Sequence, residues 1–378
     1  MQPHEFDLLV VGAGPAGSAA AIAALRENPG ARVLVLDRSP LGRDKVCGDG
    51  IAPHAVAELG ELGVIGVLPA EIVESVRLVS PGGAGTAAVT GSPGYVVPRA
   101  VFDERLARAA IGAGAEFVEE RVVTVEQDAA GVTVNGSWQA PVLVGADGSN
   151  SIVRRQVGQP SNKGRALAVA IRGYAPTPRT ARDEILLRWD SHRAGGLCYA
   201  WAFPTANGTT NVGYGLSSGA PDHSRAHLER RLRDLLPEYD LAGVELVGHT
   251  LPLTVSRPRA SVGRVLLTGD AASLINPFTG EGIYSAIASG ALAGAAAVRD
   301  VADAGRSYER ALAERFGRQH RQMRLLYPLI DAPFVLDAVI RGCEADRRLF
   351  DRLLEVGLGD SAFRLRDLLA FGRYLRLR

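Results

Sequence analysis

The sequence has 378 residues, 47% of them hydrophobic and 22% charged, which is the composition of a globular protein with a substantial core and room for about two domains. Its 42 Lys and Arg nearly balance its 41 Asp and Glu, so the net charge of +1 excludes a strongly basic nucleic-acid-binding protein and an acidic disordered chain. Three cysteines, Cys47, Cys198 and Cys343, are an odd number, which argues against a disulfide framework. No apolar run is long enough to cross a bilayer, so we expect a cytoplasmic protein.

The first fifty residues have the pattern of a β-α-β unit. Phe6–Val11 is apolar without alternation, which is typical of a strand buried on both faces of a parallel sheet. A glycine-rich turn leads to an alanine-rich helix predicted over Pro15–Glu27. A second buried strand is predicted over Arg32–Leu36, and the polar loop Arg38–Gly50 follows Asp37. This succession predicts a Rossmann-like α/β domain.

Further along the chain, buried strands and helices alternate with β-rich stretches. Short strands broken at residues 81–83 and 92–94 are predicted within Val76–Val97, and a meander is predicted from Glu116–Val125 and Gly131–Val134. The stretch from about Leu167 to Leu253 is also β-rich. Further buried strands are predicted at Val142–Gly145 and Val265–Leu267, with helices at His54–Leu62, Arg99–Gly112, Ser224–Leu236 and Gly282–Val298 and a helical remainder to Arg378.

This order predicts one discontinuous domain with a second domain inserted into it. Residues 1–68, 98–160 and 258–320 carry the buried strands and glycine turns of a Rossmann-like domain. Residues 69–97 and 161–257 carry the mainly antiparallel β-sheet of a substrate domain. Residues 321–378 form a C-terminal helical segment, so the fold class is α/β (α+β).

The first glycine turn is a dinucleotide-binding fingerprint. Residues 12–17 read G-x-G-x-x-G between a predicted strand and a predicted helix, and Asp37 lies twenty positions beyond Gly17. Gly12 permits the tight turn, Gly14 lets a pyrophosphate approach the backbone, and Gly17 allows close packing of helix on strand. The helix N-terminus faces the phosphates and Asp37 accepts the ribose hydroxyls. The predicted cofactor-binding residues of this element also include Pro15, Ala16 and Arg38.

Two later elements favour FAD over NAD as the dinucleotide. Asp147-Gly148 follows one buried strand and Gly269-Asp270 follows another. A carboxylate at a strand end before a helix N-terminus suits a polyol such as the ribityl chain. In the loop after Asp270, Gly280 and Gly282 expose backbone N–H groups that can hold a flavin carbonyl, whose negative charge grows on reduction. Pro277 and Ile283 belong to the same loop.

Together these elements resemble the FAD-dependent oxidoreductases of the para-hydroxybenzoate hydroxylase fold. The resemblance implies that the first element binds the ADP half of FAD and that Asp147-Gly148 stands near the pyrophosphate and adenosine. It also implies that Gly269-Asp270 binds the ribityl chain. Arg99, which opens the helix predicted over Arg99–Gly112, matches the position of the family's FAD-contacting arginine.

Three further stretches are similar to the geranylgeranyl reductase family within that superfamily. Lys45–Gly50 matches the family's K-x-C-G-x-G segment, and Tyr199–Pro204 matches its Y-x-W-x-F-P pattern. Asn276–Ile283 looks like its flavin loop. The resemblance implies that Cys47 and Gly48 lie in the cavity beside the flavin, with Cys47 as the candidate catalytic residue. It supports the family more strongly than the substrate, since the same family label is carried by enzymes of specialised metabolism with other chemistry.

The residues of these stretches also have their own physical interpretation. Alternation places Tyr199, Trp201 and Phe203 on one face of a strand that ends at Pro204, where they form either a wall for an apolar chain or flat ring, or ordinary core packing. Cys47 in its glycine-flanked loop is either a cavity residue or a small buried hydrophobe. Lys45 and neighbouring Arg43 have two interpretations. Each contacts a phosphate or lies at the mouth of the cavity, or each is an ordinary solvated charge.

The C-terminal segment Phe363–Arg378 combines seven large apolar side chains with five Arg and one Asp. Such a segment either lies peripherally on an anionic membrane surface or docks on the protein with a solvated arginine face. No cluster of histidine, cysteine or carboxylate residues has the spacing of a metal site.

Two enzymatic hypotheses and one non-enzymatic hypothesis follow. The first is a reductase that saturates C=C bonds of an apolar prenyl-like substrate by hydride transfer from reduced flavin. The second is a monooxygenase that hydroxylates or epoxidises an aromatic or polyketide-like specialised metabolite. The third is a prenyl-binding escort protein without flavin chemistry, against which the intact glycines and Asp270 argue. Because there is no second fingerprint, NADPH or NADH would have to act as a transient reductant or be replaced by ferredoxin or a quinol, and the electron donor stays open.

Overall fold

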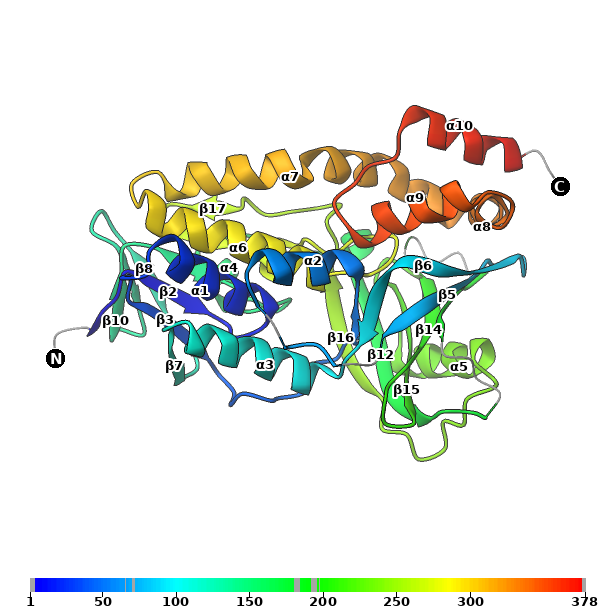
Figure 1. Cartoon of the computed structure of the whole chain (residues 1–378), viewed down its shortest axis with the longest axis horizontal. Helices are drawn as coiled ribbons and strands as arrows, with labels where there is room; N and C mark the ends of the chain where they lie inside the picture. The colour runs from blue at the N-terminus through cyan, green and yellow to red at the C-terminus, as the bar shows by residue number, and fades with distance from the viewer. Residues whose placement is uncertain are drawn as a thin grey trace.

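The fold is seen in a computed structural model that describes residues 4–64, 66–69, 72–179, 184–191, 196 and 198–375, except for the side chains of residues 92 and 93. Two lobes lie side by side, one built on a mainly parallel sheet and the other on a larger curved sheet (Figure 1). The last three residues of the predicted membrane-contacting segment, 376–378, lie outside the described residues.

The first lobe is built on a six-stranded sheet with the order β17-β18-β11-β2-β3-β7. Its neighbours run parallel except for β17, which pairs antiparallel with β18. β7 was predicted as part of the meander, and this is wrong, because β7 joins the parallel sheet beside β3. The strands are β2 (Leu8–Val11), β3 (Val33–Asp37), β7 (Glu116–Glu119), β11 (Leu143–Gly145), β17 (Ser261–Val262) and β18 (Val265–Leu267).

A small four-stranded sheet closes the outer end of this lobe, with the order β1-β10-β9-β8. Its strands are β1 (His4–Glu5), β8 (Val125–Gln127), β9 (Val132–Val134) and β10 (Trp138–Ala140). The helices of the lobe are α1 (Pro15–Glu27), α2 (Pro53–Glu61), α3 (Arg99–Gly112), α4 (Ile152–Gln156), α6 (Ile283–Arg299) and α7 (Ala304–Leu326).

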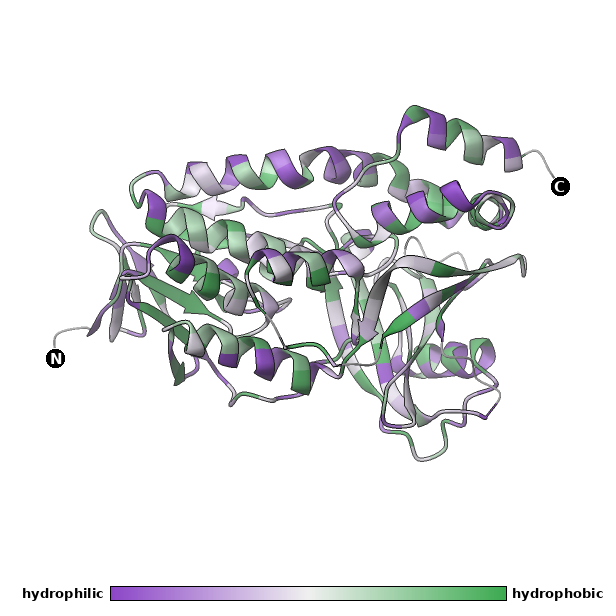
Figure 2. Ribbon diagram, in the orientation of Figure 1, coloured by the Kyte–Doolittle hydropathy of each residue, from purple (hydrophilic) through white to green (hydrophobic). Residues whose placement is uncertain are grey.

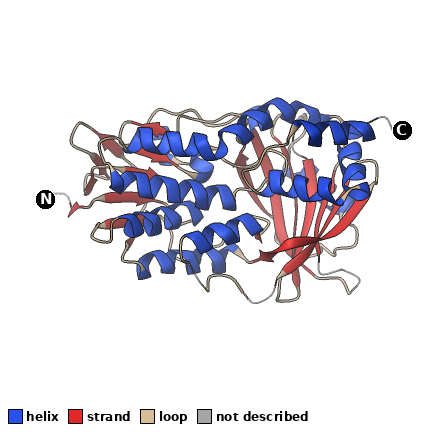
Figure 3. Ribbon diagram, turned by 45° about the horizontal axis from the view of Figure 1, so that its top comes forward, coloured by secondary structure: helices blue, strands red, loops and turns tan. Residues whose placement is uncertain are grey.

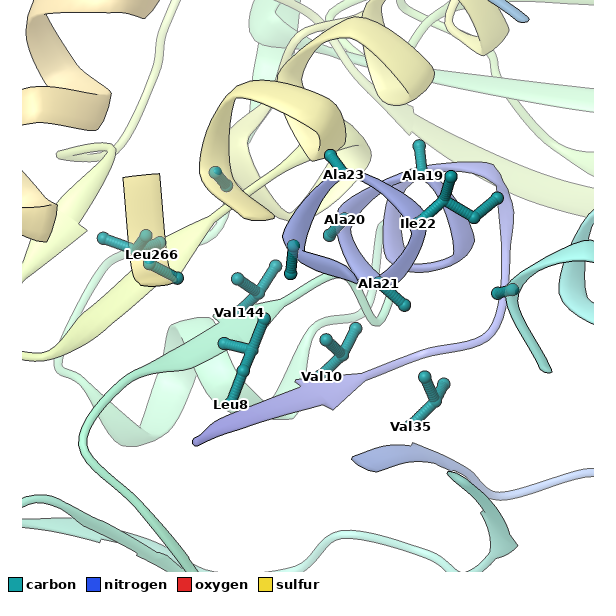
Figure 4. Close-up of a cluster of buried hydrophobic side chains, with 14 of the residues drawn as sticks. Leu8, Val10, Ala19, Ala20, Ala21, Ile22, Ala23, Val35, Val144 and Leu266 are labelled. Carbon is teal, nitrogen blue, oxygen red and sulfur yellow. The ribbon is translucent and has the colours of Figure 1, made fainter. Parts of the chain in front are cut away.

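Small residues let α1 lie flat between the parallel sheet and α6. The alanines of α1 stand over the apolar side chains of β2, β3, β11 and β18 (Figure 4). On the opposite side, a Cβ on Gly290 of α6 would lie 2.0 Å from the backbone oxygen of Ala16, and a Cβ on Gly294 would lie 1.9 Å from that of Ala20. The two helix backbones are therefore in direct contact, which fixes the first turns of α1 against the middle of α6.

The second lobe is built on an eight-stranded sheet with the order β16-β12-β15-β14-β13-β5-β6-β4. Its pairings are antiparallel except that β13 and β5 run parallel. The strands are β4 (Gly50–Ile51), β5 (Val73–Val79), β6 (Gly85–Val96), β12 (Leu167–Pro176), β13 (Glu184–Trp189), β14 (Cys198–Pro204), β15 (Thr209–Ser217) and β16 (Val247–Pro252).

The predicted strand break at residues 92–94 is wrong, because β6 continues through it. The irregularity appears instead as a shift in register: Val73 of β5 pairs with Gly94, whereas Ser75 pairs with Val89. Proline within an edge region is tolerated at such a bulge because its missing N–H is not required there. The break at residues 81–83 is confirmed as the turn between β5 and β6.

Helices cover both faces of the eight-stranded sheet (Figures 1 and 3). The four C-terminal elements pack on one face, and α5 (Arg225–Leu235) packs on the other. The C-terminal elements are η3 (Tyr327–Asp331), α8 (Pro333–Ala345), α9 (Arg347–Leu358) and α10 (Leu365–Tyr374), and two short turns are η1 (Gly164–Ala166) and η2 (Gly269–Ala272).

The predicted fold class is confirmed: a Rossmann-like α/β lobe, a mainly antiparallel β-sheet lobe and a helical C-terminus. The predicted domain boundaries stay a prediction. One strand crosses them, since β4 at Gly50–Ile51 pairs with β6 in the eight-stranded sheet.

The α1–α6 contact makes a testable prediction about stability. We expect Gly294→Ala to lower the free energy of unfolding by about 1–3 kcal/mol, because the added methyl group overpacks the contact with the backbone of Ala20. The matched control is Gly60→Ala in α2, where a Cβ meets nothing within 4 Å. That change raises the free energy of unfolding by up to about 1 kcal/mol through helix propensity. Urea unfolding measures both, and equal effects of the two changes would contradict the close packing.

Candidate functional site

A cavity of about 510 Å³ lies where the two lobes and the C-terminal helices meet. Its ionisable lining residues come from the loops of the first lobe and from the sheet face: Lys45, Cys47, Arg99, Tyr199, His249, Asp270 and Glu281. The part of the wall contributed by residues 326–375 consists only of apolar side chains and glycines. The cavity thus joins a polar region at the predicted flavin loops to an apolar region beneath α8, α9 and α10.

The glycines of the fingerprint have two different roles. Gly12 adopts a φ of +106°, and a Cβ there would lie 2.4 Å from the backbone oxygen of Ala146. A Cβ on Gly17 would lie 1.8 Å from the backbone oxygen of Gly12, so both positions serve the packing of the turn. Gly14 differs, since the nearest atom to a Cβ there is an Asp103 oxygen 4.0 Å away. Its backbone is therefore open to a ligand.

The start of α1 has the properties of an anion site. Its N-cap, Gly14, provides no side-chain hydrogen bond, and the first turn contains no acidic residue. The backbone N–H groups of this turn are thus available, and the helix dipole adds a partial positive charge. Pro15 lines the cavity, whereas Gly12, Gly14, Ala16 and Gly17 are not part of its lining. These features fit the pyrophosphate of FAD.

Asp37 holds the glycine turn and does not line the cavity, and its contact with a ribose stays a prediction. Its Oδ2 accepts a hydrogen bond of 2.8 Å from the backbone N–H of Ala13, and its Oδ1 accepts one of 3.0 Å from that of Ser39. Arg43 approaches the carboxylate at 3.6 Å. Arg38 is exposed and does not line the cavity.

Asp147 is engaged by its own chain. Its carboxylate accepts hydrogen bonds from the Ser151 hydroxyl at 2.5 Å and from the backbone N–H groups of Ile152 and Val153, so it caps α4. Neither Asp147 nor Gly148 lines the cavity. Gly148 does lie close to it, because a Cβ there would be 4.0 Å from the Lys45 Nζ.

Asp270 forms an ion pair inside the cavity wall. Its Oδ2 lies 3.1 Å from the Lys45 Nζ, so Lys45 is a cavity residue and not a solvated charge. Burial works to raise the pKa of Asp270, but Lys45 and His249 outweigh it, and the pKa lies below its usual value. Gly269, with a φ of +54°, turns the chain behind this carboxylate and stays outside the cavity lining.

His249 is a cavity residue that the sequence did not indicate. It lies on β16, and its Nε2 is 3.0 Å from the Ser149 hydroxyl, which joins the two lobes across the polar region. Burial and the nearby Lys45 charge lower the pKa of His249 to about 4, so the imidazole is neutral at physiological pH. A single histidine on an alternating strand carries no sequence signal of this position.

The loop after Asp270 presents its backbone to the cavity as predicted. Gly280, with a φ of +69°, Gly282 and Ile283 line the cavity, while Pro277 is buried outside the lining. Glu281 between the glycines accepts a hydrogen bond of 2.6 Å from the backbone N–H of Tyr284 at the start of α6. Burial raises its pKa to about 8, so this carboxyl group is largely protonated near neutral pH.

The Cys47 loop is positioned by a buried polar network. The Asn211 side chain donates hydrogen bonds of 2.8 Å to the backbone oxygen of Cys47 and to the Asp49 carboxylate, and accepts one of 2.9 Å from the Trp201 indole. The Tyr174 hydroxyl donates to Asp49 at 2.5 Å. Asp49 is fully buried with a φ of +64°, and sequence reasoning missed this anchoring role.

Cys47 and Gly48 both line the cavity. Burial raises the pKa of the Cys47 thiol, although the Arg99 charge acts in the opposite direction. The thiol therefore keeps its proton near neutral pH. Arg99 is buried at the start of α3 and lines the cavity, with its guanidinium held by two hydrogen bonds of 2.6 Å to Asp103.

The aromatic face of β14 is confirmed by the structure. Tyr199, Trp201 and Phe203 line the cavity, while the alternate residues of the strand pack toward α5. Pro204 ends the strand outside the cavity lining. The Tyr199 hydroxyl donates a hydrogen bond to the backbone oxygen of Thr279, which ties this wall to the flavin loop.

Metal-binding clusters and membrane-spanning helices are both absent from the described part of the chain. Among the described residues, no group of three or more His, Cys, Asp and Glu side chains is arranged to hold a metal ion. In the same part of the chain, no helix combines the length and apolar character needed to cross a bilayer. All three cysteines are free.

Comparison with known proteins connects this site to flavoproteins. Residues 5–296 match a family described as an FAD binding domain. Menaquinone reductase of Mycobacterium tuberculosis is 34% identical over 353 residues, covering 86% of this chain and 84% of that protein. Digeranylgeranylglycerophospholipid reductase 1 of Methanopyrus kandleri is 33% identical over 314 residues, covering 79% and 81%. The crystal structure of a geranylgeranyl bacteriochlorophyll reductase-like protein from Thermoplasma acidophilum matches with a TM-score of 0.81 at 25% identity, covering 98% of this chain and 96% of that one.

The two kinds of fingerprint glycine are separable by mutation. We expect Gly14→Ala to leave the thermal stability of the FAD-free protein unchanged and to weaken FAD binding at least tenfold, because its methyl group meets no protein atom closer than 4.0 Å and occupies the approach to the backbone. Gly17→Ala should instead destabilise the protein itself. Thermal melts and flavin fluorescence titration measure the two effects, and loss of stability in Gly14→Ala would contradict this assignment.

The protonation of Cys47 is testable by alkylation. Because its pKa is raised, the thiolate fraction at pH 7 is small, and we expect iodoacetamide to modify native Cys47 at least tenfold more slowly than a free thiol. The rate should rise as the pH approaches the raised pKa. Peptide mass spectrometry follows this residue separately from Cys198 and Cys343, and denatured protein provides the reference. Fast modification at pH 7 would show a thiolate instead.

Proposed function

Since the chain belongs to the geranylgeranyl reductase family of FAD-dependent oxidoreductases, we propose that it reduces C=C bonds of an apolar, prenyl-like substrate by hydride transfer from reduced flavin. The observation that carries this proposal is the cavity that runs from the loops of the FAD-binding lobe to the apolar wall under the C-terminal helices. An extended hydrocarbon suits such a wall because burying it removes apolar surface from water and leaves no polar group without a hydrogen-bond partner.

The residues that would hold the cofactor come from three loops. The start of α1 would face the pyrophosphate, Lys45 and Asp270 would contact the polyol chain, and the backbone N–H groups of Gly280 and Gly282 would meet the flavin ring. Bound and reduced FAD supplies the hydride for the reaction. Arg99, whose charge is balanced by its ion pair with Asp103, places a guanidinium in the same region.

The chain's own residues orient the substrate and keep water out. Tyr199, Trp201 and Phe203 form one wall, and the apolar side chains of α8, α9 and α10 form the opposite one. Holding an alkene in one orientation beside the flavin loops converts the hydride transfer into a step within one complex. The second alkene carbon needs a proton, and the Cys47 Sγ carries one at the cavity wall. The alkylation measurement therefore also tests the protonation state that this role requires.

The electron donor is proposed to be NADPH or NADH, acting transiently on the bound flavin. The sequence holds no second dinucleotide fingerprint, so a nicotinamide cofactor would have to bind transiently, and ferredoxin or a quinol is the alternative donor. Monooxygenation of an aromatic or polyketide-like ring is the competing outcome, since a flavin in the same fold can also react with oxygen.

One anaerobic experiment separates these outcomes. The FAD-loaded enzyme is reduced with NADPH, NADH or dithionite, and a detergent-dispersed prenyl substrate is then added. We expect the flavin absorbance near 450 nm to return as a saturated product forms, at least tenfold faster than without substrate. Absence of reoxidation with menaquinone-like and geranylgeranyl-lipid substrates would sink the proposal. Oxygen-dependent incorporation of one oxygen atom would establish the monooxygenase instead.

A further inference from the structure

The C-terminal helices carry exposed apolar side chains that nothing in the described chain covers. Among its large hydrophobic residues, the four most exposed are Leu325, Leu365, Leu369 and Phe334, with 74%, 73%, 63% and 61% of their surface open. Leu329 and Leu375 are 50% and 43% exposed. We call these six residues the apolar collar. Clusters of exposed apolar residues on one part of a protein mark an interaction surface more often than scattered ones do.

The collar is continuous with the cavity. Leu329 and Leu375 are exposed to solvent and also line the cavity wall, although they belong to η3 and to the end of α10. Leu326 and Leu368, next to collar residues in the sequence, line the cavity as well. The collar therefore borders the apolar region of the cavity, and the C-terminal helices lie at the end of the molecule opposite the N-terminus (Figure 1).

Unpaired arginines accompany the collar. Arg321, Arg324 and Arg373 are exposed and form no ion pair within the described part of the chain. Two carboxylates on the same elements are already engaged, since Asp331 pairs with Arg165 and Asp367 pairs with Arg352. Hydropathy colouring shows hydrophobic and hydrophilic turns interleaved along α10 (Figure 2). This combination of exposed leucines and free positive charge matches an anionic lipid surface.

We propose that the apolar collar docks on an anionic phospholipid bilayer, so that a lipid substrate passes from the membrane into the cavity without crossing water. The leucines and Phe334 enter the acyl–headgroup boundary, and Arg321, Arg324 and Arg373 meet the lipid phosphates. The binding surface stands on its own observations, while the passage of substrate rests on the proposed function. An opening bordered by membrane-inserted side chains spares the hydrocarbon the cost of exposure during transfer.

The test is flotation of FAD-loaded full-length protein with vesicles of phosphatidylcholine alone or with 30% phosphatidylglycerol. We expect binding to the anionic vesicles at least tenfold stronger than to the neutral ones. Two double variants, L325S/F334S and L365S/L369S, should each weaken it at least tenfold. These four side chains do not line the cavity, so the variants should keep their thermal melts and their rates with detergent-dispersed substrate. The matched control is R121Q/V123S, which removes an exposed arginine and a 54%-exposed valine from the first lobe.

The outcomes separate membrane docking from an interface between copies of the chain and from failure of the proposed function. Equal vesicle binding by the collar variants and the wild type would overturn the proposal, as would absence of binding to anionic vesicles. A change in oligomeric state of the variants by sedimentation would assign the collar to an interface between copies and also overturn it. If collar-dependent binding holds while no prenyl substrate reoxidises the flavin, the docking surface stands and the proposed function fails. If both hold, the variants should lose activity with vesicle-embedded substrate only.

Discussion

The flavin loop at residues 276–283 is held from two sides, and the cavity depends on this double attachment. From the side of the C-terminal helices, the backbone oxygen of Val356 accepts a hydrogen bond of 3.1 Å from Asn276, and that of Gly357 accepts one of 2.6 Å from Thr279. From the side of the large sheet, Tyr199 donates to the backbone oxygen of Thr279. The loop that carries Gly280 and Gly282 is thus attached both to the C-terminal helices and to the large sheet, and a shift of either one moves it.

A second cluster fastens the C-terminal segment to the FAD-binding lobe. Arg315 of α7 forms an ion pair of 2.5 Å with Glu58 of α2 and one of 3.1 Å with Asp360, and Tyr284 of α6 donates to the same Asp360 at 2.5 Å. Partly buried charges of this kind contribute more than surface pairs, because each would be left without a partner if one were removed. The C-terminal helices are therefore part of the rigid frame of the cavity and not an appended tail. A membrane-facing collar on them would be held in fixed relation to the flavin loops.

The features that could be predicted from the sequence are those whose contacts join residues close together in the chain. The fingerprint was predictable because its glycines are required by local sterics. Gly12 and Gly17 are five residues apart in the sequence, and their backbones are in contact. Strand alternation likewise predicted that Tyr199, Trp201 and Phe203 lie on the same face of β14. His249 and Asn211 were not predictable, because their partners Ser149 and Asp49 lie 100 and 162 residues away. The role of Asp147 in the α4 cap is a local feature, since Ser151 follows only four residues later.

Glycine also explains how the aromatic wall obtains its shape. A Cβ on Gly213 of β15 would lie 2.1 Å from the Trp201 ring, and a Cβ on Gly48 would lie 3.0 Å from the Phe203 ring. The Trp201 ring therefore packs on the backbone of Gly213, and the Phe203 ring packs on that of Gly48. The indole is further fixed by its hydrogen bond to Asn211. Because Gly48 belongs to the Cys47 loop, the position of the wall and the position of the thiol are set by the same contact. The substrate region and the polar region therefore share this packing contact, and the loop that carries Cys47 is held in addition by the hydrogen bonds of Asn211.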